Sequence, residues 1–107
     1  MASKALHLVQ DQEYVGDGRD DHYWSWSIWL EGAESELDSV DYVEYTLHPT
    51  FPKPVRRIHD RQTNFKLATA GWGVFRIYAK VFNKDGAVIP LQHDLKLYFP
   101  SGRLNLS

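Results

Sequence analysis

Two short segments of the sequence combine aromatic, hydroxyl-bearing and glycine residues in a way that favours a binding pocket. The first segment, residues 47–54, has three prolines within six residues, so its backbone is stiff, extended and poor in hydrogen-bond donors. It carries Thr50 and Phe51. The second segment, residues 70–75, places Trp72 between two glycines, which lets the backbone turn sharply and admits another chain close to its amides. Loops of this kind, presented by a rigid scaffold, are where binding residues concentrate.

The same residues also have a purely structural interpretation. Phe51 and Trp72 are large enough to plug the end of a β-domain, and His48 would then be a loop histidine that binds no ligand. The combination favours the pocket, because a hydroxyl accompanies one ring and glycines accompany the other.

Catalytic and metal-binding chemistry have little support in the sequence. Ser27, His48 and Asp41 supply the side chains of a hydrolase, but no spacing groups them, and no nucleophile elbow or glycine-rich phosphate loop is present. The histidines form no pair at i, i+2 or i, i+4, and the chain has no cysteine. These histidines are His7, His22, His48, His59 and His93. We therefore expect a binding protein, not an enzyme, with no metal and no cofactor.

Period-two alternation of apolar and polar residues dominates the chain and predicts half-buried β-strands. The clearest runs are residues 24–30, 42–47, 75–81 and 94–99. Weaker strand candidates are residues 4–9 and 87–91, and Pro90 predicts that the second lies at a sheet edge or ends early.

The segments between these runs carry turn chemistry. Asn83–Gly86 predicts a hairpin with glycine at a position of positive φ, and residues 33–39 are the only stretch suited to a helix, of one or two turns. Short strands with turns at this spacing are typical of an immunoglobulin-like β-sandwich. We expect an all-β sandwich of about seven or eight antiparallel strands, forming a single domain over residues 1–107.

The composition indicates the class of protein and its cellular compartment. A chain of 107 residues with 43% hydrophobic residues suits one globular domain. The absence of cysteine fits a reducing compartment, and neither a signal-peptide run nor an apolar stretch of membrane-spanning length is present. We expect an intracellular protein that does not bind membranes.

Charge is unevenly distributed along the chain. The net charge is −2, which does not favour nucleic acid as a partner. Residues 1–50 hold 11 acidic and 2 basic side chains, whereas residues 51–107 hold 3 acidic and 10 basic ones. Since the halves of a sandwich interleave, we expect a mixed surface; the alternative is an acidic patch near Asp17, Asp20 and Asp21 that attracts a basic partner.

Over residues 22–100 the chain resembles a YEATS domain. Two motifs carry most of the resemblance: Leu47-His48-Pro49-Thr50-Phe51-Pro52-Lys53-Pro54, and Gly71-Trp72-Gly73-Val74-Phe75 some twenty residues later. Either motif alone would be weak, but the pair is fairly specific. Further similar pieces are Trp26–Gly32, Val43–Leu47, Phe65 and Asp94–Leu97. The short chain suggests a prokaryotic member or an isolated domain.

The resemblance implies an immunoglobulin fold and a reader of acetylated or crotonylated lysine, with an acylated peptide or protein as partner. The setting would be cytoplasmic for a prokaryotic protein and nuclear for a eukaryotic chromatin reader. A neutral, planar acyl-amide suits a slot between two rings, whereas a charged, unmodified lysine would have to be desolvated. The alternative is a protein–protein interaction domain of the same fold that reads no acyl-lysine.

Roles within the pocket are also implied by the resemblance. Phe51 and Trp72 would be the two rings, and Thr50, oriented by His48, would accept the acyl-amide N–H. The backbone N–H groups around Trp72 and Gly73 would hold the acyl carbonyl. The following residues are the expected ligand-binding set: His22, His48, Thr50, Phe51, Gly71, Trp72 and Gly73.

Two positions depart from the family pattern. His22 stands where the family usually has a third aromatic residue, and Thr50 stands where serine is common. The extra methyl group of Thr50 keeps the hydroxyl but stiffens its rotamer. Gly73 would leave room for longer acyl groups such as crotonyl.

Overall fold

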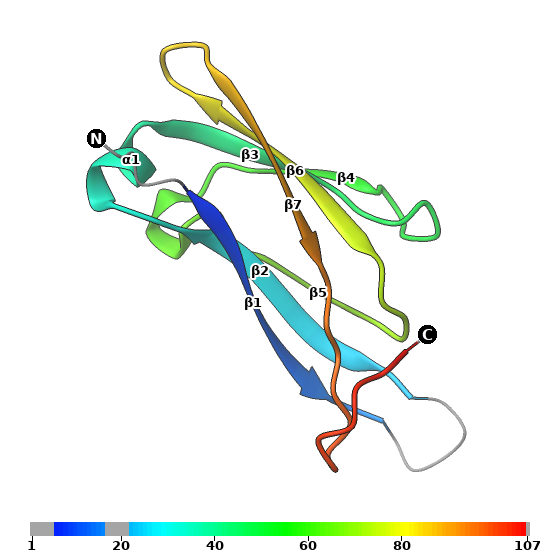
Figure 1. Cartoon of the computed structure of the whole chain (residues 1–107). Coiled ribbons are helices and arrows are strands. Elements are labelled where there is room, and N and C mark those ends of the chain that lie inside the picture. The colour runs from blue at the N-terminus through cyan, green and yellow to red at the C-terminus, as the bar shows by residue number, and fades with distance from the viewer. Residues whose placement is uncertain (1–5, 17–21, 107) are drawn as a thin grey trace.

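Two antiparallel β-sheets packed face to face make up the computed structural model, which describes residues 6–16 and 22–106 (Figure 1). The three-stranded sheet has the order β1 (His7–Tyr14), β2 (Trp24–Glu31), β5 (Leu67–Gly71). The four-stranded sheet has the order β4 (Val55–Ile58), β3 (Val40–Thr46), β6 (Arg76–Asn83), β7 (Val88–Asp94). Every strand pairing is antiparallel, so the expected immunoglobulin-like sandwich is confirmed.

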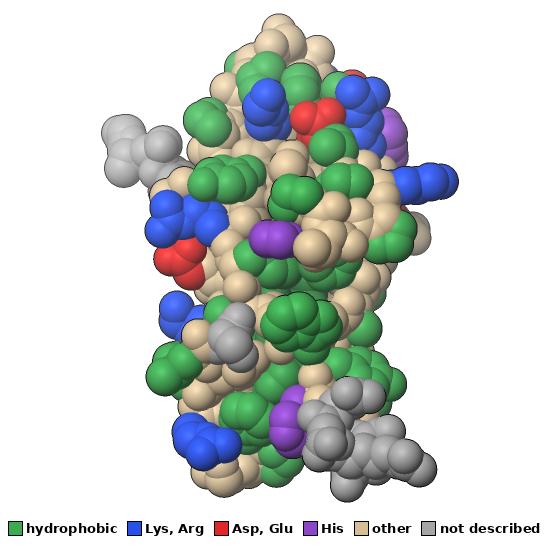
Figure 2. Space-filling model, turned by 90° about the vertical axis from the view of Figure 1, so that its right-hand side faces the viewer, with side chains coloured by type: hydrophobic (Ala, Val, Ile, Leu, Met, Phe, Trp, Pro, Cys, Tyr) green, Lys and Arg blue, Asp and Glu red, His purple; other side chains and the backbone are tan. Residues whose placement is uncertain are grey.

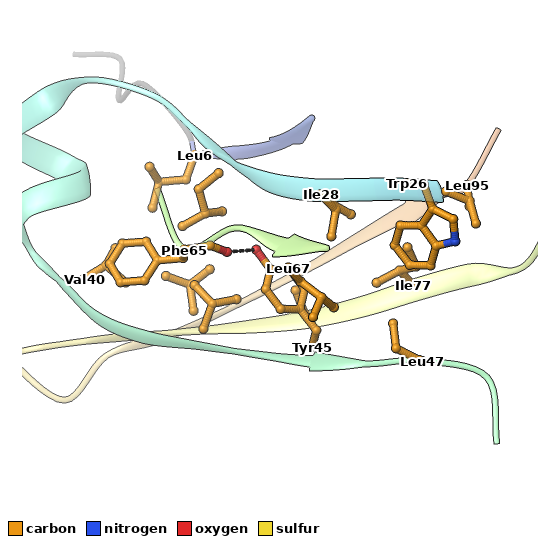
Figure 3. Close-up of a cluster of buried hydrophobic side chains, with 14 of the residues drawn as sticks. Leu6, Trp26, Ile28, Val40, Tyr45, Leu47, Phe65, Leu67, Ile77 and Leu95 are labelled. Atoms are coloured by element: carbon orange, nitrogen blue, oxygen red, sulfur yellow. Dashed lines mark hydrogen bonds between the residues drawn. The ribbon is translucent and has the colours of Figure 1, made fainter. Parts of the chain in front are cut away.

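The apolar and polar residues that alternate in the sequence form the buried and exposed faces of each strand. In β2, the even-numbered residues from Trp24 to Leu30 are buried between the sheets. Residues from β3 and β6 face them, and Figure 3 shows the resulting cluster filling the space between the two layers. The burial of these side chains is the main favourable contribution to folding, at about 1.5–3 kcal/mol for each fully buried large side chain.

Tyr45 makes a hydrogen bond inside this core. Its side chain is fully buried, and its hydroxyl donates to the carbonyl oxygen of Phe65 at 2.6 Å (Figure 3). Burial raises the pKa of Tyr45, because the phenolate would lose its hydration. The bond links β3 to the segment that leads into β5.

The connections follow the predicted turn chemistry. The helix α1 (Glu34–Asp38) lies within the stretch expected to be helical. A hairpin joins β6 to β7, and Gly86 adopts the expected positive φ, of 96°. A short 3-10 helix, η1 (Arg61–Thr63), was not expected; the carboxylate of Asp60 caps it by accepting from the backbone N–H of Gln62.

One expected strand is wrong. Residues 95–99 keep an alternation of buried and exposed side chains, but they join no ladder beyond an isolated bridge between Tyr98 and Leu104. Their backbone bonds to Phe75, Arg103 and Asn105, and side chains from β1 bond to it as well. Gln10 donates to the carbonyl of Lys96 and accepts from its N–H, and Gln12 accepts from the N–H of Tyr98.

The weaker strand candidates are longer than expected. The β1 strand runs on to Tyr14, whereas Lys4 and Ala5 lie outside the described residues. The β7 strand continues through Pro90 to Asp94 and forms an edge of its sheet, which is one of the two outcomes that Pro90 predicted. The β5 strand was not predicted from the sequence; its last two residues, Ala70 and Gly71, belong to the second candidate segment.

The two halves of the chain mix their charges across the surface. Arg57 pairs with Glu44, and Arg61 pairs with both Glu34 and Asp38. The alternative acidic patch, at Asp17, Asp20 and Asp21, lies outside the described residues. In the part of the chain that is described, no helix has the length and apolar character needed to cross a membrane.

Candidate functional site

The two candidate loops meet at one end of the sandwich. The loop of residues 47–54 joins β3 to β4, and the loop of residues 72–75 joins β5 to β6; both lie on the right of Figure 1. Figure 2 looks onto this side and shows hydrophobic side chains and a histidine around a hollow at mid-height. The sheets therefore present the two loops together.

The β3–β4 loop is held in shape by its own backbone. The N–H of Leu47 donates to the carbonyl of Pro54 at 2.8 Å, and the N–H of Phe51 donates to the carbonyl of His48 at 3.0 Å. The guanidinium of Arg56 also donates to the carbonyls of Pro52 and Lys53. With its prolines fixing φ, the loop is an ordered platform for the side chains it carries.

His48 and Thr50 form a pair whose proton positions follow from geometry. Both the hydroxyl and the backbone N–H of Thr50 lie within hydrogen-bond distance of Nδ1 of His48, at 2.9 Å and 3.2 Å. A backbone N–H can only donate, so Nδ1 accepts and carries no proton. The hydroxyl then donates to the same nitrogen, which leaves the lone pairs of Oγ1 to accept from another group.

Phe51 lies partly buried between this loop and the core. Its ring contacts the ring of Phe75, with centroids 5.4 Å apart, and meets Trp26 edge-on at 6.4 Å. His48 also meets Phe75 edge-on, with ring centroids 6.0 Å apart. The ring of Phe51 is therefore fixed by aromatic neighbours.

Trp72 combines an anchored backbone with an exposed side chain. The side chain of Asn105, which is buried, donates to the carbonyl of Trp72 at 3.1 Å. The indole itself is 69% exposed. Among the turn and loop hydrogen bonds of the described residues, the N–H groups of Trp72 and Gly73 are not donors. Trp72 therefore combines a fixed backbone with an exposed ring.

A hollow of about 430 Å³ lies between the two loops. Six of the seven expected ligand-binding residues line it: His48, Thr50, Phe51, Gly71, Trp72 and Gly73. Four more residues of the two candidate loops line it but were not in the expected ligand-binding set: Pro52, Ala70, Val74 and Phe75. The predicted strand 75–81 included Phe75, but β6 begins one residue later, so the ring of Phe75 lines the hollow.

His22 does not line this hollow. Its Nδ1 is hydrogen-bonded to the hydroxyl of Tyr14, and its ring meets that of Phe99 edge-on at 5.3 Å. Trp24 and Tyr14 complete this second aromatic group. A role for His22 in ligand binding remains a prediction.

The electrostatics of the hollow suit a neutral ligand. Among the described residues that line it, none is an aspartate, glutamate, lysine or arginine. The ion pair between Arg76 and Asp94 adjoins a second hollow, which shares Val74 and Phe75 with the first. There the guanidinium of Arg76 lowers the pKa of Asp94 by hydrogen bonding. In residues 6–16 and 22–106, no group of three acidic, histidine or cysteine side chains could hold a metal ion.

Comparison with known proteins gives a family match over most of the chain. The family model described as "prokaryotic YEATS domain" matches residues 24–96. This range includes both candidate loops and all the residues that line the hollow.

Curated relatives are similar over a comparable region. Transcription initiation factor TFIID subunit 14 of Schizosaccharomyces pombe is 38% identical over 94 residues, covering 77% of this chain and 38% of that protein. Protein AF-9 homolog of Saccharomyces cerevisiae is 35% identical over 83 residues, covering 73% of this chain and 36% of that protein. The chain thus spans well under half the length of these relatives.

Solved structures share the fold. A structure of the Yaf9 YEATS domain recognizing an H3K122suc peptide has a TM-score of 0.68 at 25% identity, covering 91% of this chain and 78% of that one. A structure of the yeast AF-9 homolog protein Yaf9 has a TM-score of 0.69 at 26% identity, covering 91% and 71%.

Proposed function

Since this chain belongs to the YEATS domain family, in its prokaryotic form, we propose that it is a reader module that binds acylated lysine, such as acetyl-lysine or crotonyl-lysine, in a peptide or protein. One observation carries the proposal: Phe51, Trp72 and Thr50, from two different loops, line the same hollow. We further propose that residues 1–107 act as one such domain, with binding as its activity and no catalysis.

The proposed pose places the acyl-amide between the two rings. An amide is planar and uncharged, so both of its faces gain contact area when it stacks between Phe51 and Trp72. Phe51 is held by Phe75 and Trp26, whereas Trp72 is largely exposed until a ligand covers it. One wall is therefore fixed, and the other wall gains burial on binding.

Two polar contacts would orient the amide. Its N–H donates to Oγ1 of Thr50, whose own proton is directed toward His48. Its carbonyl accepts from the backbone N–H groups at Trp72 and Gly73, which make no turn or loop hydrogen bond within the described residues. A donor and an acceptor at opposite edges fix the amide in the plane of the slot.

Selection against unmodified lysine follows from the lack of an anionic partner. No carboxylate is found among the described residues that line the hollow. An ammonium group would lose hydration on entry without gaining an ion pair, which is strongly unfavourable. Acylation removes that charge. Recognition of an H3K122suc peptide by the similar Yaf9 domain supports a modified-lysine peptide as the class of partner.

Calorimetric titration with matched peptides tests the proposal. We expect an acetyl-lysine or crotonyl-lysine peptide to bind with a Kd in the micromolar to millimolar range, roughly −8 to −4 kcal/mol, and the unmodified peptide not to bind measurably. Trp72→Ala should weaken binding about tenfold, or roughly 1.4 kcal/mol, because it removes one stacking face.

The control variant is Trp29→Ala. Trp29 is partly exposed on β2 and contacts Lys66, away from the hollow, so its loss should leave the affinity unchanged. Equal affinities for wild type and Trp72→Ala would overturn the proposal. An absence of binding to every acylated peptide would favour the alternative, a protein–protein interaction domain of the same fold.

A further inference from the structure

The loop of residues 72–75, which carries Trp72, is held by the C-terminal part of the chain. The side chain of Asn105 donates to the carbonyl of Trp72 at 3.1 Å, and the N–H of Leu95 donates to the carbonyl of Phe75 at 3.1 Å. Figure 1 shows the C-terminal end of the chain beside this loop. The backbone under one wall of the hollow is therefore fixed by residues that lie well beyond the loop in sequence.

The hairpin of residues 97–105, which ends in Asn105, is itself anchored to the sandwich. The backbone N–H of Asn105 donates to the carbonyl of Leu97 at 2.8 Å. The indole N–H of Trp24, on β2, donates to the carbonyl of Tyr98 at 2.7 Å, and Trp24 is fully buried. The hairpin thus gives the side chain of Asn105 a defined position.

The amide of Asn105 is buried behind the loop and not in the hollow. Asn105 is 7% exposed, and it is not among the residues that line the hollow. Burying an amide is unfavourable unless its polar atoms find partners, and the carbonyl of Trp72 is one such partner. A polar side chain in this place can act on the site only through the backbone of the loop.

The bond from Asn105 acts on the peptide group that joins Trp72 to Gly73. This group is planar and trans, so its carbonyl and its N–H point in opposite directions. The carbonyl is directed toward Asn105, and the N–H, which belongs to Gly73, is therefore directed away from it. Gly73 lines the hollow. A carbonyl that accepts a hydrogen bond also polarises its peptide group, which strengthens the donor at the other end.

We propose that Asn105 is a positioning residue for the acyl-lysine site. By holding the carbonyl of Trp72, it orients and strengthens the N–H of Gly73 that binds the acyl carbonyl. The inference rests on the proposed reader function and deepens it. It adds to the site a residue that lies outside the range matched by the family model, residues 24–96, and that touches no ligand.

Two peptides that differ in one acceptor atom test this role. The same peptide carries either acetyl-lysine or thioacetyl-lysine, in which sulfur replaces the acyl oxygen and accepts hydrogen bonds more weakly. We expect the wild-type chain to bind the acetyl peptide about fivefold more tightly, since one hydrogen bond to a neutral group contributes about that much. In Asn105→Ala, which removes the donor, this ratio should fall to about two or less.

The ratio separates positioning from a merely structural role. If Asn105 only stabilised the fold, its loss would weaken both peptides equally and leave the ratio at the wild-type value. Leu106→Ala is the matched control, because Leu106 is the next residue and is 86% exposed, so both affinities should stay unchanged. If Asn105→Ala does not fold, as judged by its thermal melt, Asn105→Leu also removes the donor while filling the space, and supplies the ratio.

An NMR signal of the wild-type chain gives a readout that needs no variant. The side-chain NH2 signals of Asn105 should shift when the acetyl peptide binds and shift less with the thioacetyl peptide, because the peptide group between them is polarised from both ends. Unshifted signals, an unchanged ratio in the variants, or equal binding of the two peptides by the wild-type chain would each overturn the inference and leave the reader function standing. Failure of the wild-type chain to bind both peptides would instead remove the reader function.

Discussion

The hydroxyl of Thr50 is the side-chain acceptor available to the acyl-amide N–H in the proposed pose. Its proton is committed to Nδ1 of His48, so it cannot serve as a donor to the ligand. The methyl group of Thr50 restricts the rotamer and keeps the hydroxyl aligned before the ligand arrives. The pair is therefore organised in advance to accept one hydrogen bond.

Replacing this hydroxyl by a methyl group should weaken binding with little effect on folding. Thr50→Val keeps the side-chain shape, so we expect a loss of about 1–2 kcal/mol in affinity for an acetyl-lysine peptide, measured by calorimetric titration. Thr46→Val is the matched control, because Thr46 lies on β3 outside the lining of the hollow. Unchanged affinity in Thr50→Val would rule out a role for the hydroxyl.

At the residue scale, sequence reasoning found most of the candidate site, and its omissions have a physical reason. Phe51 and Trp72 were recognisable because prolines and glycines mark their loops. The lining by Val74 and Phe75 depends on where β6 begins. That boundary is not encoded by residue type or spacing alone.

At the scale of elements, the edge strand β1 is connected to the opposite sheet by side chains. Gln10 makes three hydrogen bonds: one from its Nε2 to the carbonyl of Lys96, and two received by its Oε1 from the N–H of Lys96 and from Nε2 of His93. The amide of a glutamine carries the same donor and acceptor as a peptide group. Gln10 thus occupies the place of a neighbouring strand for this segment.

Removing that amide should destabilise the sandwich. We expect Gln10→Ala to lower the free energy of unfolding by about 1–2 kcal/mol, because three polar groups lose their partner and are only partly rehydrated. Urea denaturation measures the change. Gln92→Ala is the control, since Gln92 is exposed on β7. Equal midpoints for the two variants would show that the bridge contributes nothing.

The same element shows why one strand was wrongly predicted. Leu95 and Leu97 are buried while Lys96 and Tyr98 are exposed, so the alternation in the sequence is real. Alternation reports which face of an extended backbone is buried, but not what its N–H and C=O groups bond to. Here glutamine side chains of β1 take the place that a neighbouring strand would have.

At the scale of the whole molecule, His93 makes stability depend on pH. Burial lowers its pKa, with Lys96 adding to the effect and Asp94 partly offsetting it. Below the ordinary value of 6.5, the unfolded chain binds a proton that the folded chain still excludes. This contribution therefore lowers stability as the pH falls from 6.5 toward the folded-state pKa, and has no effect above that window.

Thermal melts at pH 7, 6 and 5 check this dependence. We expect the wild-type Tm to fall more between pH 7 and 5 than the Tm of His93→Gln, which keeps a donor near Gln10 but does not titrate in this range. The Arg76–Asp94 pair does not change the stability between pH 7 and pH 5. Its contribution is lost only below pH 3.8, as the pH falls through the lowered pKa of Asp94. Parallel curves for the two proteins would contradict the expectation.

The architecture as a whole was well determined by sequence. Seven described strands in two layers agree with the alternation and turn spacing, and the family match agrees with the two loop motifs. The order of strands within each sheet was beyond reach, because it depends on long-range pairing. The short strand β5 was missed because it runs into the glycines that mark the loop.

The edges of the four-stranded sheet have a consequence for self-association. One edge is β7, where Pro90 lacks an N–H group, and the other is β4, which has four residues, two of them arginines. Fibril growth and strand exchange require an uninterrupted row of donors along a flat, uncharged margin. Neither margin of this sheet provides one, so the four-stranded sheet is protected against pairing with further copies at its edges.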